Sequence, residues 1–325
     1  MKMKNHYYDQ RKAHHNAQGF QNIEPFSVSI SDVKKWKRER RVNPPREGYT
    51  HFEQTWWQPA NFNCLDDAIW WLGHASTLIQ INQRTILTDP IFSKRASPVA
   101  FAGPKRYTPS ACQIEDLPHI DVIAISHNHY DHLDHASIKK LIKRFPHVTV
   151  VVPLGLKNKL QRWGANEVIE LDWWQSVDIN GMLLTSMPAR HWSRRGLFDT
   201  NRTLWCGWMI EFAKRCVYFV GDTSYTTQFK LIPQHFAHID VALIPIGSYA
   251  PRWFMHNQHV DPAQALQLFN DIGCKRAMAI HWGTFELADE PLDEPPQLLQ
   301  HLFAQYHVSP QDFSVLKIGQ SILLD

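Results

Sequence analysis

The densest group of reactive side chains lies in residues 126–134, which read SHNHYDHLD. In an extended segment, residues two apart point to the same side, so His127 and His129 can reach one ion together. Once the chain turns, Asp131 and His132 can reach a second position. A single histidine is commonly structural. Three histidines and an aspartate at this spacing, between an apolar strand and a helix, predict a metal site.

The ends of other predicted strands supply the remaining ligands, because four residues cannot fill two metal positions. His191 follows the strand at 182–187, Asp222 follows the strand at 216–220, and His281 follows RAMAI at 276–280. We expect one ion to be bound by His127, His129 and His191, a second by Asp131, His132 and His281, and both by a bridging Asp222. All seven residues offer nitrogen or oxygen, which suits two Zn²⁺ ions and also tolerates Fe or Mn²⁺.

Short strands and the helices between them must position these residues. Apolar runs predict strands at 68–73, 77–81, 84–92, 121–126, 148–152, 182–187, 204–212, 216–220, 240–247 and 276–280. Helices are predicted at 136–145, 157–163 and 261–273. Two halves, each with strands followed by helices, predict an αββα four-layer sandwich of the α+β class. His74 and Asp89 also follow strand ends, and we expect them to orient other ligands rather than to bind metal.

Helix ends are marked clearly in two places. Asp134 is expected to cap the helix at 136–145. Asp261 is expected to cap the helix at 261–273, with Pro262 in its first turn and Gln264 completing a capping box. Gly273 is expected to end that helix.

Composition and charge limit the partners and the compartment. The net charge of +3 is too small to indicate a nucleic-acid partner. Five cysteines, an odd number without a CxxC pair, favour a reducing compartment. The N-terminus lacks the apolar segment of a signal peptide, and no run of 18 apolar residues predicts a membrane span. We therefore expect a cytoplasmic protein.

Residues 34–46 carry seven basic residues against one glutamate. One interpretation is a solvated helix end that runs into a Pro-Pro linker. The other is a peripheral contact with the inner face of an anionic membrane, where each basic residue near the surface contributes about 1 kcal/mol.

Several longer segments are similar to those of a known family. The HxHxDH pattern resembles the metallo-β-lactamase superfamily. WLGHAST, LTDPIFSKRASP, GDTSY, PIGSYAPRWFM, QHVDP and AIHWGTF resemble the N-acylphosphatidylethanolamine-hydrolysing phospholipase D family, from about residue 65 onward. Ser224 stands where that family usually has glycine, and Ser248 where it usually has alanine. The first 50 residues resemble nothing comparable, which divides the chain into a polar, basic extension at 1–50 and a hydrolase domain at 51–325.

The resemblance implies a dinuclear zinc enzyme that acts on a phospholipid with an acylated ethanolamine nitrogen, and it also implies a homodimer. Two ions about 3.5–4 Å apart can bind a phosphate diester and share a hydroxide that attacks phosphorus. The products would be an N-acylethanolamine and phosphatidic acid. Asp131, Asp222 and His259 are the candidate catalytic residues.

Substrate-side residues are expected around two segments. His259 is either a buried structural histidine or a donor to a phosphoryl oxygen. Tyr130 either packs under the helix or, by the resemblance, contacts substrate. The remaining candidates form one run, Arg252, Trp253, Phe254 and Met255. The three apolar residues of this run either pack in the core or line an acyl groove, and Arg252 either meets the phosphate or makes a surface ion pair.

Two other functions compete with this one. The same ligand set would serve a lactonase or another metal-dependent hydrolase, because hydroxide attacks esters and phosphodiesters alike. A protein of another class, a lipid-binding protein on an inactive scaffold, is disfavoured by the complete set of seven ligands.

Overall fold

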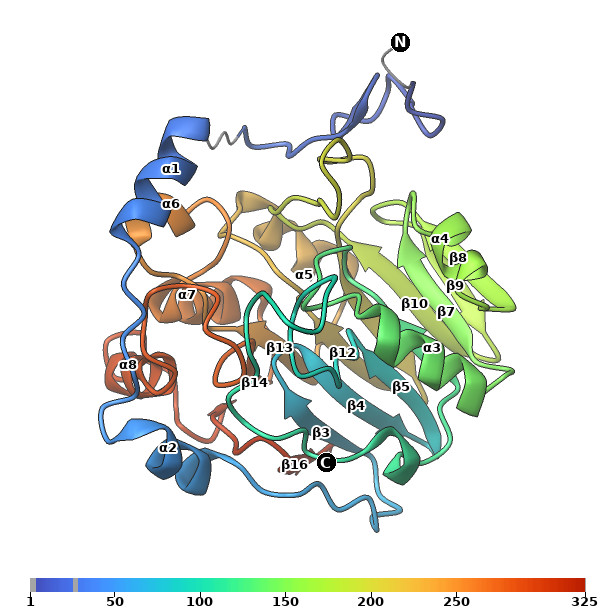
Figure 1. The fold of residues 1–325 in the computed structure, drawn as a ribbon. Helices are drawn as coiled ribbons and strands as arrows, with labels where there is room; N and C mark the ends of the chain where they lie inside the picture. Colours follow the sequence, from blue (N-terminus) through green and yellow to red (C-terminus); the bar gives the residue numbers. More distant parts are fainter. Residues whose placement is uncertain (1–3, 26–28, 325) are drawn as a thin grey trace.

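The computed structural model describes residues 4–25 and 29–324 and consists of two mixed β-sheets packed face to face, with helices on their outer surfaces (Figure 1). The chain's buried apolar residues form one main core that includes Trp70, Trp71 and Trp208 from strands of both sheets. Layers of helix, sheet, sheet and helix are therefore confirmed, as the strand and helix patterns predicted.

The first sheet has the strand order β16-β3-β4-β5-β6-β7-β8. Its strands are β3 (Ala68–Gly73), β4 (Ser76–Ile81), β5 (Arg84–Thr88), β6 (Val122–Ala124), β7 (Thr149–Pro153), β8 (Glu167–Leu171) and β16 (Ser321–Leu323). The helical segments between them are η1 (Ile114–Asp116), α3 (His135–Arg144) and α4 (Lys157–Arg162). Strands β5 to β8 are parallel, whereas β16, β3, β4 and β5 pair antiparallel.

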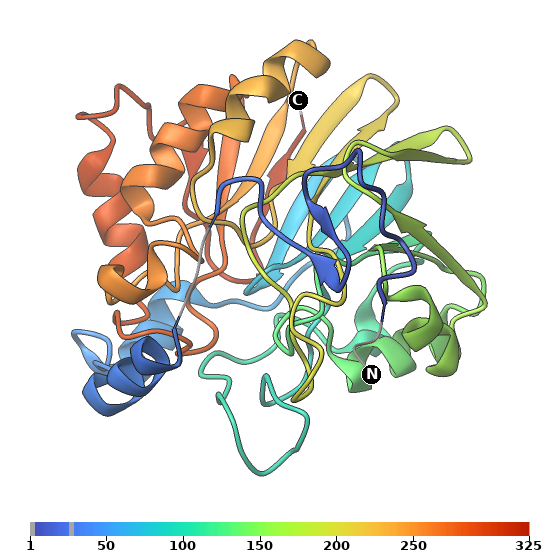
Figure 2. The same ribbon diagram turned by 90° about the horizontal axis from the view of Figure 1, so that it is seen from above.

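The second sheet has the order β15-β14-β13-β12-β11-β10-β9. Its strands are β9 (Ser176–Ile179), β10 (Met182–Met187), β11 (Gly207–Phe212), β12 (Arg215–Phe219), β13 (Val241–Pro245), β14 (Arg276–Ile280) and β15 (Phe313–Ser314). The helical segments that follow them are η2 (Thr227–Leu231), α5 (Ile232–His235), α6 (Arg252–Met255), α7 (Pro262–Ile272) and α8 (Glu294–Leu302). Helices α7 and α8 pack side by side on the outer face (Figure 2).

Residues before the first sheet lie across the domain. They form β1 (His15–Asn16), β2 (Gly19–Phe20), α1 (Ile30–Glu39) and α2 (Gly48–Trp56). The β1–β2 hairpin is tied to the domain by His14 and Lys12, which both pair with the buried carboxylate of Asp172. Helix α1 packs against α6, where the Trp36 ring stacks on Phe254. The polar extension predicted at 1–50 therefore contains ordered elements that contact the domain.

The direction of the strands brings the polar strand ends together. Strand β3 is parallel to β5 because both are antiparallel to β4, and β5 is parallel to β6. Strand β10 is likewise parallel to β12, which is parallel to β13 and β14. The carboxyl ends of these strands therefore carry the polar clusters to one edge of the sandwich.

The predicted helix caps are confirmed with one correction. The Asp134 carboxylate accepts from the Ser137 amide, and the Asp261 carboxylate accepts from the Gln264 amide. Gly273 ends α7 in the left-handed region, with φ of 63°. The capping box was wrong in its second half, because the Gln264 side chain accepts a hydrogen bond from Arg252 instead.

In the described residues, no helix combines the length and the apolar character needed to cross a bilayer.

Candidate metal centre

The Asp222 carboxylate lies between two groups of histidines at the carboxyl edge of the sheets. Its Oδ2 atom is 3.9 Å from His127 Nε2 and 3.7 Å from His191 Nε2 on one side. On the other side, Oδ2 is 3.1 Å from His132 Nε2, and Oδ1 is 3.0 Å from His281 Nε2. The structure therefore brings together the residue predicted to bridge and members of both predicted ligand groups.

The first group is made of three imidazoles whose nitrogens converge. His127 Nε2 lies 2.8 Å from His129 Nδ1, and His191 Nε2 lies 3.3 Å from the same atom. His127 and His129 come from the segment after β6, and His191 comes from the segment after β10. Three ligand atoms at this separation could occupy three corners of a tetrahedral metal site and leave the fourth position open.

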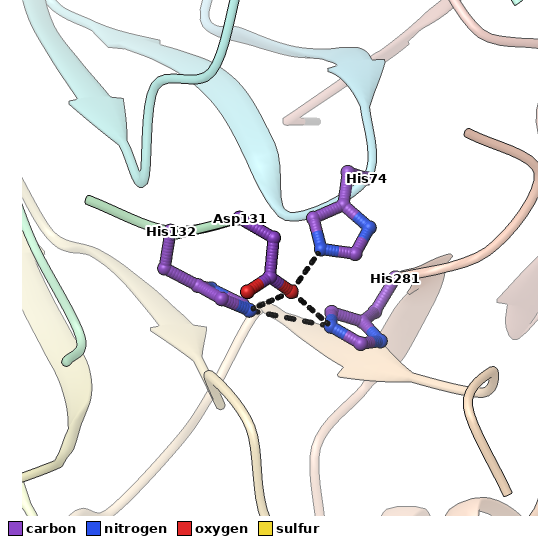
Figure 3. A group of neighbouring side chains, drawn as sticks. All are labelled: His74, Asp131, His132 and His281. Carbon is purple, nitrogen blue, oxygen red and sulfur yellow. Dashed lines mark hydrogen bonds and ion pairs between the residues drawn. The ribbon is translucent and has the colours of Figure 1, made fainter. Parts of the chain in front are cut away.

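The second group joins Asp131, His132 and His281, with His74 beside them (Figure 3). Asp131 Oδ2 lies 3.2 Å from His132 Nε2 and 3.8 Å from His281 Nε2. The His74 ring contacts the same oxygen at 2.8 Å through its Nε2 atom. This contact allows His74 to orient the Asp131 carboxylate, and that role of His74 stays a prediction, because its ring also belongs to the group of four side chains that could hold an ion.

Hydrogen bonds on the far side of three rings direct their Nε2 lone pairs inward. His132 Nδ1 donates to the Asp89 carboxylate at 2.7 Å, and His191 Nδ1 donates to the Gln258 carbonyl at 3.0 Å. The Ser126 hydroxyl donates to Asp89, so His127 Nδ1 must donate to the Ser126 oxygen at 2.9 Å. Such outer partners fix the tautomer of metal-binding histidines.

The charge of the site fits a pair of cations. The ion-pair partners of Asp131 and Asp222 in the described part of the chain are all histidines. Asp222 Oδ1 and His259 Nδ1 are buried without a hydrogen-bond partner. A buried and a half-buried carboxylate that pair with no lysine or arginine among the described residues, facing unsatisfied nitrogen and oxygen atoms, are the surroundings that divalent metals occupy.

Burial and crowding also set the protonation of the rings. Desolvation, together with the neighbouring His191, lowers the pKa of His129 to about 3, and desolvation lowers the pKa of His191 to about 4. Burial also lowers the pKa of His281, but the carboxylates of Asp222 and Asp131 outweigh it and raise that pKa to about 9. Without a bound cation, a proton on His281 partly neutralises the negative charge of Asp222 and Asp131. A bound cation would take over that role.

The backbone at these strand ends is strained. His74, Asp89 and His281 have φ values of 54°, 35° and 62°, and Ser248 has φ of 65°. Non-glycine residues in this region cost about 1–3 kcal/mol each and gather at functional sites. The packed sheets hold these residues in conformations that direct their side chains toward the centre.

Three residues near the centre were not identified from the sequence. The Trp192 ring lies edge-on to His129, with centroids 4.5 Å apart. Gln258 accepts from Trp192 through its side chain. The Arg195 guanidinium donates to the carbonyls of Asn128 at 2.9 Å and Leu133 at 2.6 Å. Trp192 and Gln258 adjoin residues of the predicted site in sequence, whereas nothing in the local sequence marks Arg195.

The predicted substrate-side residues have varied positions. His259 faces the centre, 3.9 Å from Asp222 Oδ2 through its Nδ1 atom. The Tyr130 hydroxyl donates to the Arg195 carbonyl, and its ring lies 3.9 Å from that guanidinium. Arg252 pairs with Asp261 and donates to the His259 carbonyl, so its guanidinium is engaged in holding the His259 segment.

The apolar run after Arg252 lies beside a cavity. Phe254 and Met255 are buried and line a cavity of about 540 Å³ together with Val33, Trp36 and Trp192. Trp253 is 41% exposed, and the Lys35 ammonium lies over its ring. At one end the cavity is lined by Trp192, the residue after His191, and it is also lined by Val33 and Trp36 of helix α1.

The chain is similar to known proteins along most of its length. The beta-lactamase superfamily domain matches residues 84–282. N-acyl-phosphatidylethanolamine-hydrolyzing phospholipase D 1 of Caenorhabditis elegans is 39% identical over 77% of this chain and 74% of its own length. The mitochondrial phospholipase of that name from Saccharomyces cerevisiae is 35% identical over 71% of this chain, which spans 51% of the yeast protein.

Solved structures agree on the fold. Igni18, a metallo hydrolase of Ignicoccus hospitalis, superposes with a TM-score of 0.59 at 20% identity and covers 79% of this chain and 97% of its own. The isothiocyanate hydrolase from Delia radicum gut bacteria gives a TM-score of 0.63 at 14% identity, over 78% of this chain and 98% of its own. With the domain match and the nematode relative, these likenesses establish that the chain is a hydrolase of the N-acylphosphatidylethanolamine-hydrolysing phospholipase D family, within the metallo-β-lactamase superfamily.

Proposed function

We propose that this protein is a dinuclear zinc phosphodiesterase that cleaves N-acylphosphatidylethanolamine into an N-acylethanolamine and phosphatidic acid. The observation that carries the proposal is the Asp222 carboxylate, which lies between two groups of converging nitrogen and oxygen atoms. The names of the nematode and yeast relatives support the same substrate class. His127, His129 and His191 would hold one ion and Asp131, His132 and His281 the other.

Two zinc ions, when bound, would acidify water and neutralise charge on phosphoryl oxygens. The protein's own groups would orient the reaction. The pKa of His259 lies well below its ordinary value because the ring is buried, so the imidazole is neutral. Its unpartnered Nδ1 could donate to a non-bridging phosphoryl oxygen, where a positioned donor stabilises the charge that develops in the transition state. The bond between phosphorus and the oxygen of the N-acylethanolamine group breaks. Water supplies the new oxygen on phosphorus, and the leaving alkoxide takes up a proton.

The cavity beside Trp192 would hold the N-acyl chain. Its walls include Trp36 from α1 and Phe254 and Met255 from α6. Each methylene buried there contributes about 0.8 kcal/mol. A substrate with a long acyl group on nitrogen would therefore bind better than phosphatidylethanolamine, whose ammonium would remain charged.

Product analysis tests the proposal. Purified protein loaded with zinc would be incubated with N-palmitoyl-phosphatidylethanolamine and with phosphatidylethanolamine, and the products identified by mass spectrometry. We expect N-palmitoylethanolamine and phosphatidic acid from the first lipid and little turnover of the second. Equal turnover of both lipids, or faster opening of simple lactones, would favour another metal-dependent hydrolase of this fold.

Metal replacement would identify the ion. We expect chelation to abolish turnover and zinc to restore it, and a greater recovery with Fe or Mn²⁺ would correct the assignment of zinc. A cytoplasmic location and a homodimer remain predictions.

A further inference from the structure

Two loops present apolar side chains to solvent at their tips. Phe101 is 83% exposed and Val99 lies beside it, while Leu197 and Phe198 are 77% and 87% exposed. Among the described residues, three of the four most exposed large apolar side chains belong to these two tips. We call Val99, Phe101, Leu197 and Phe198 the apolar tips.

The loops that carry the apolar tips are held at their bases by specific hydrogen bonds. In the first loop, the Ala96 amide donates to the Pro104 carbonyl, and Arg95 donates to the Gly103 carbonyl. In the second loop, the Asp199 carboxylate accepts from the amides of Arg195 and Gly196. These hydrogen bonds fix the backbone at the base of each loop. The side chains at the tip therefore have defined positions.

Both loops are attached directly to the metal motif. The Ser93 hydroxyl donates to Asp134, which follows the HNHYDH segment. Arg195 donates to the carbonyls of Asn128 and Leu133 within and after that segment. A shared cavity of about 390 Å³ is lined by Val99, Ala100 and Arg195. The loops that carry the apolar tips are therefore anchored to the segment that supplies four of the candidate ligands.

In Figure 2 the first loop projects from the lower edge of the molecule, and helix α1 lies at the lower left. Both loops and the helix are basic. Lys94 and Lys105 flank the first tip, Arg194 precedes the second, and all three are exposed. Helix α1 adds the exposed Lys34, Lys35, Lys37 and Arg38. The carboxylate closest in sequence to the second tip, that of Asp199, is turned inward to its own loop.

Apolar side chains surrounded by cations match the interface of an anionic bilayer, where the tips can enter the acyl region and the cations can meet phosphates. We propose that the apolar tips insert into an anionic lipid bilayer and hold the metal centre against its surface. The inference rests on the proposed function, because a lipid substrate requires such an approach. It locates the contact on loops anchored to the metal motif, whereas the basic run at 34–46 alone would leave the orientation open.

Vesicle binding by the full-length protein tests the inference. The double variant Phe101→Ser/Phe198→Ser would be compared with wild type by co-sedimentation with vesicles of phosphatidylcholine and phosphatidylserine. We expect the variant to bind roughly tenfold more weakly or worse, since each exposed phenylalanine loses its contribution from apolar burial. Thermal unfolding and metal content should remain those of wild type, because both side chains are exposed in the folded protein.

Leu65→Ser is the matched control. Leu65 is 86% exposed but precedes β3, at the end of the strand opposite the metal centre. It should leave vesicle affinity unchanged. The triple variant Lys94→Gln/Lys105→Gln/Arg194→Gln should lose much of the preference for phosphatidylserine over pure phosphatidylcholine.

Wild-type affinity in Phe101→Ser/Phe198→Ser, or equal losses in that variant and in Leu65→Ser, would overturn the inference. The vesicles contain no N-acylated lipid, so binding is measured independently of turnover. If wild type hydrolyses the N-acylated lipid in detergent but does not bind vesicles, only this inference fails. If vesicle binding depends on the tips but no N-acylated lipid is hydrolysed, only the proposed function fails.

Discussion

At the scale of single residues, Asp222 and His259 adjoin each other but are expected to contribute differently. Asp222 pairs with both histidine groups through its carboxylate oxygens, whereas the His259 ring lies against the rings of His191 and His281 and its Nδ1 is 3.9 Å from Asp222 Oδ2. We expect His259→Ala to keep its metal and to lose about a hundredfold in kcat, the usual effect of removing one transition-state donor. Asp222→Asn should lose metal from at least one position and fall further in activity.

Kinetics with metal content measured on the same samples would check this difference. Asn has nearly the shape of Asp, so the variant removes the charge with little change in packing. Wild-type activity in Asp222→Asn would refute the bridging role, and loss of metal in His259→Ala would make His259 a ligand.

The sequence alone predicts much of the centre because its residues follow apolar strands in short motifs. The seven candidate ligands come together in the fold, and their role as ligands stays a prediction. Arg195 was missed since its contacts with Asn128 and Leu133 join segments far apart in the chain. The cavity wall at Trp36 was missed for the same reason. Contacts of this kind depend on tertiary packing, and no local pattern encodes them.

At the scale of elements, the segment after β13 depends on one carboxylate. Glu290 accepts backbone hydrogen bonds from Ser248, Tyr249 and Ala250. Desolvation raises the pKa of Glu290 to about 7, although the backbone N–H groups lower it. Between pH 4.5 and about pH 7, Glu290 therefore keeps its proton in the folded protein, whereas the unfolded chain has lost it.

This proton predicts a pH dependence of stability. Relative to Glu290→Gln, the free energy of unfolding of wild type should fall as pH rises through the interval between about 4.5 and 7, because Glu290 then binds its proton less in the unfolded state than in the folded state. In Glu290→Gln this contribution should be absent, and above that interval the two proteins should show parallel curves. Urea unfolding at several pH values would measure it, and identical slopes within the interval would contradict the assignment.

Helix α1 offers a test of the acyl cavity. The Trp36 ring stacks on Phe254 with centroids 5.0 Å apart, and both line the cavity. Trp36→Ala should raise KM for lipids with long N-acyl groups by roughly tenfold or more, since apolar contact area is lost. Lipids with a short N-acyl group should be turned over almost normally.

Lys34→Ala is the matched control for that experiment, because Lys34 is exposed on the same helix. It should leave the dependence on acyl length unchanged. An equal effect of Trp36→Ala on short and long substrates would show that Trp36 supports the fold rather than the acyl chain.

Element prediction worked where apolar runs and caps are local. Strands β3 and β10 have the expected bounds, and the caps Asp134 and Asp261 start their helices as expected. Strand β5 is shorter than the segment at 84–92, since the chain leaves the sheet after Thr88 to carry Asp89 into the centre. Strand β16 escaped prediction because it has only 3 residues and is partly exposed, and it exists through its pairing with β3.

At the scale of the whole molecule, both sheets contribute to one centre. His127, His129, Asp131 and His132 follow β6 in the first sheet, and His191, Asp222 and His281 follow strands of the second. We expect elemental analysis at saturating zinc to find two ions per chain, since seven ligands exceed the needs of one tetrahedral ion. One ion or none would refute the dinuclear assignment.

The buried carboxylate of Asp89 connects the two ligand groups. It fixes His132 in one group directly and His127 in the other through the Ser126 hydroxyl. An ion that orders one of these rings also orders Asp89. The second ion then meets a ring that is already partly ordered, so its binding costs less conformational entropy. Occupancy of the two positions should therefore be cooperative, and by thermodynamic linkage the factor is the same in either order of filling. A titration that passes directly from empty to doubly loaded protein would be its signature, and at low zinc the population would divide into fully loaded and empty molecules.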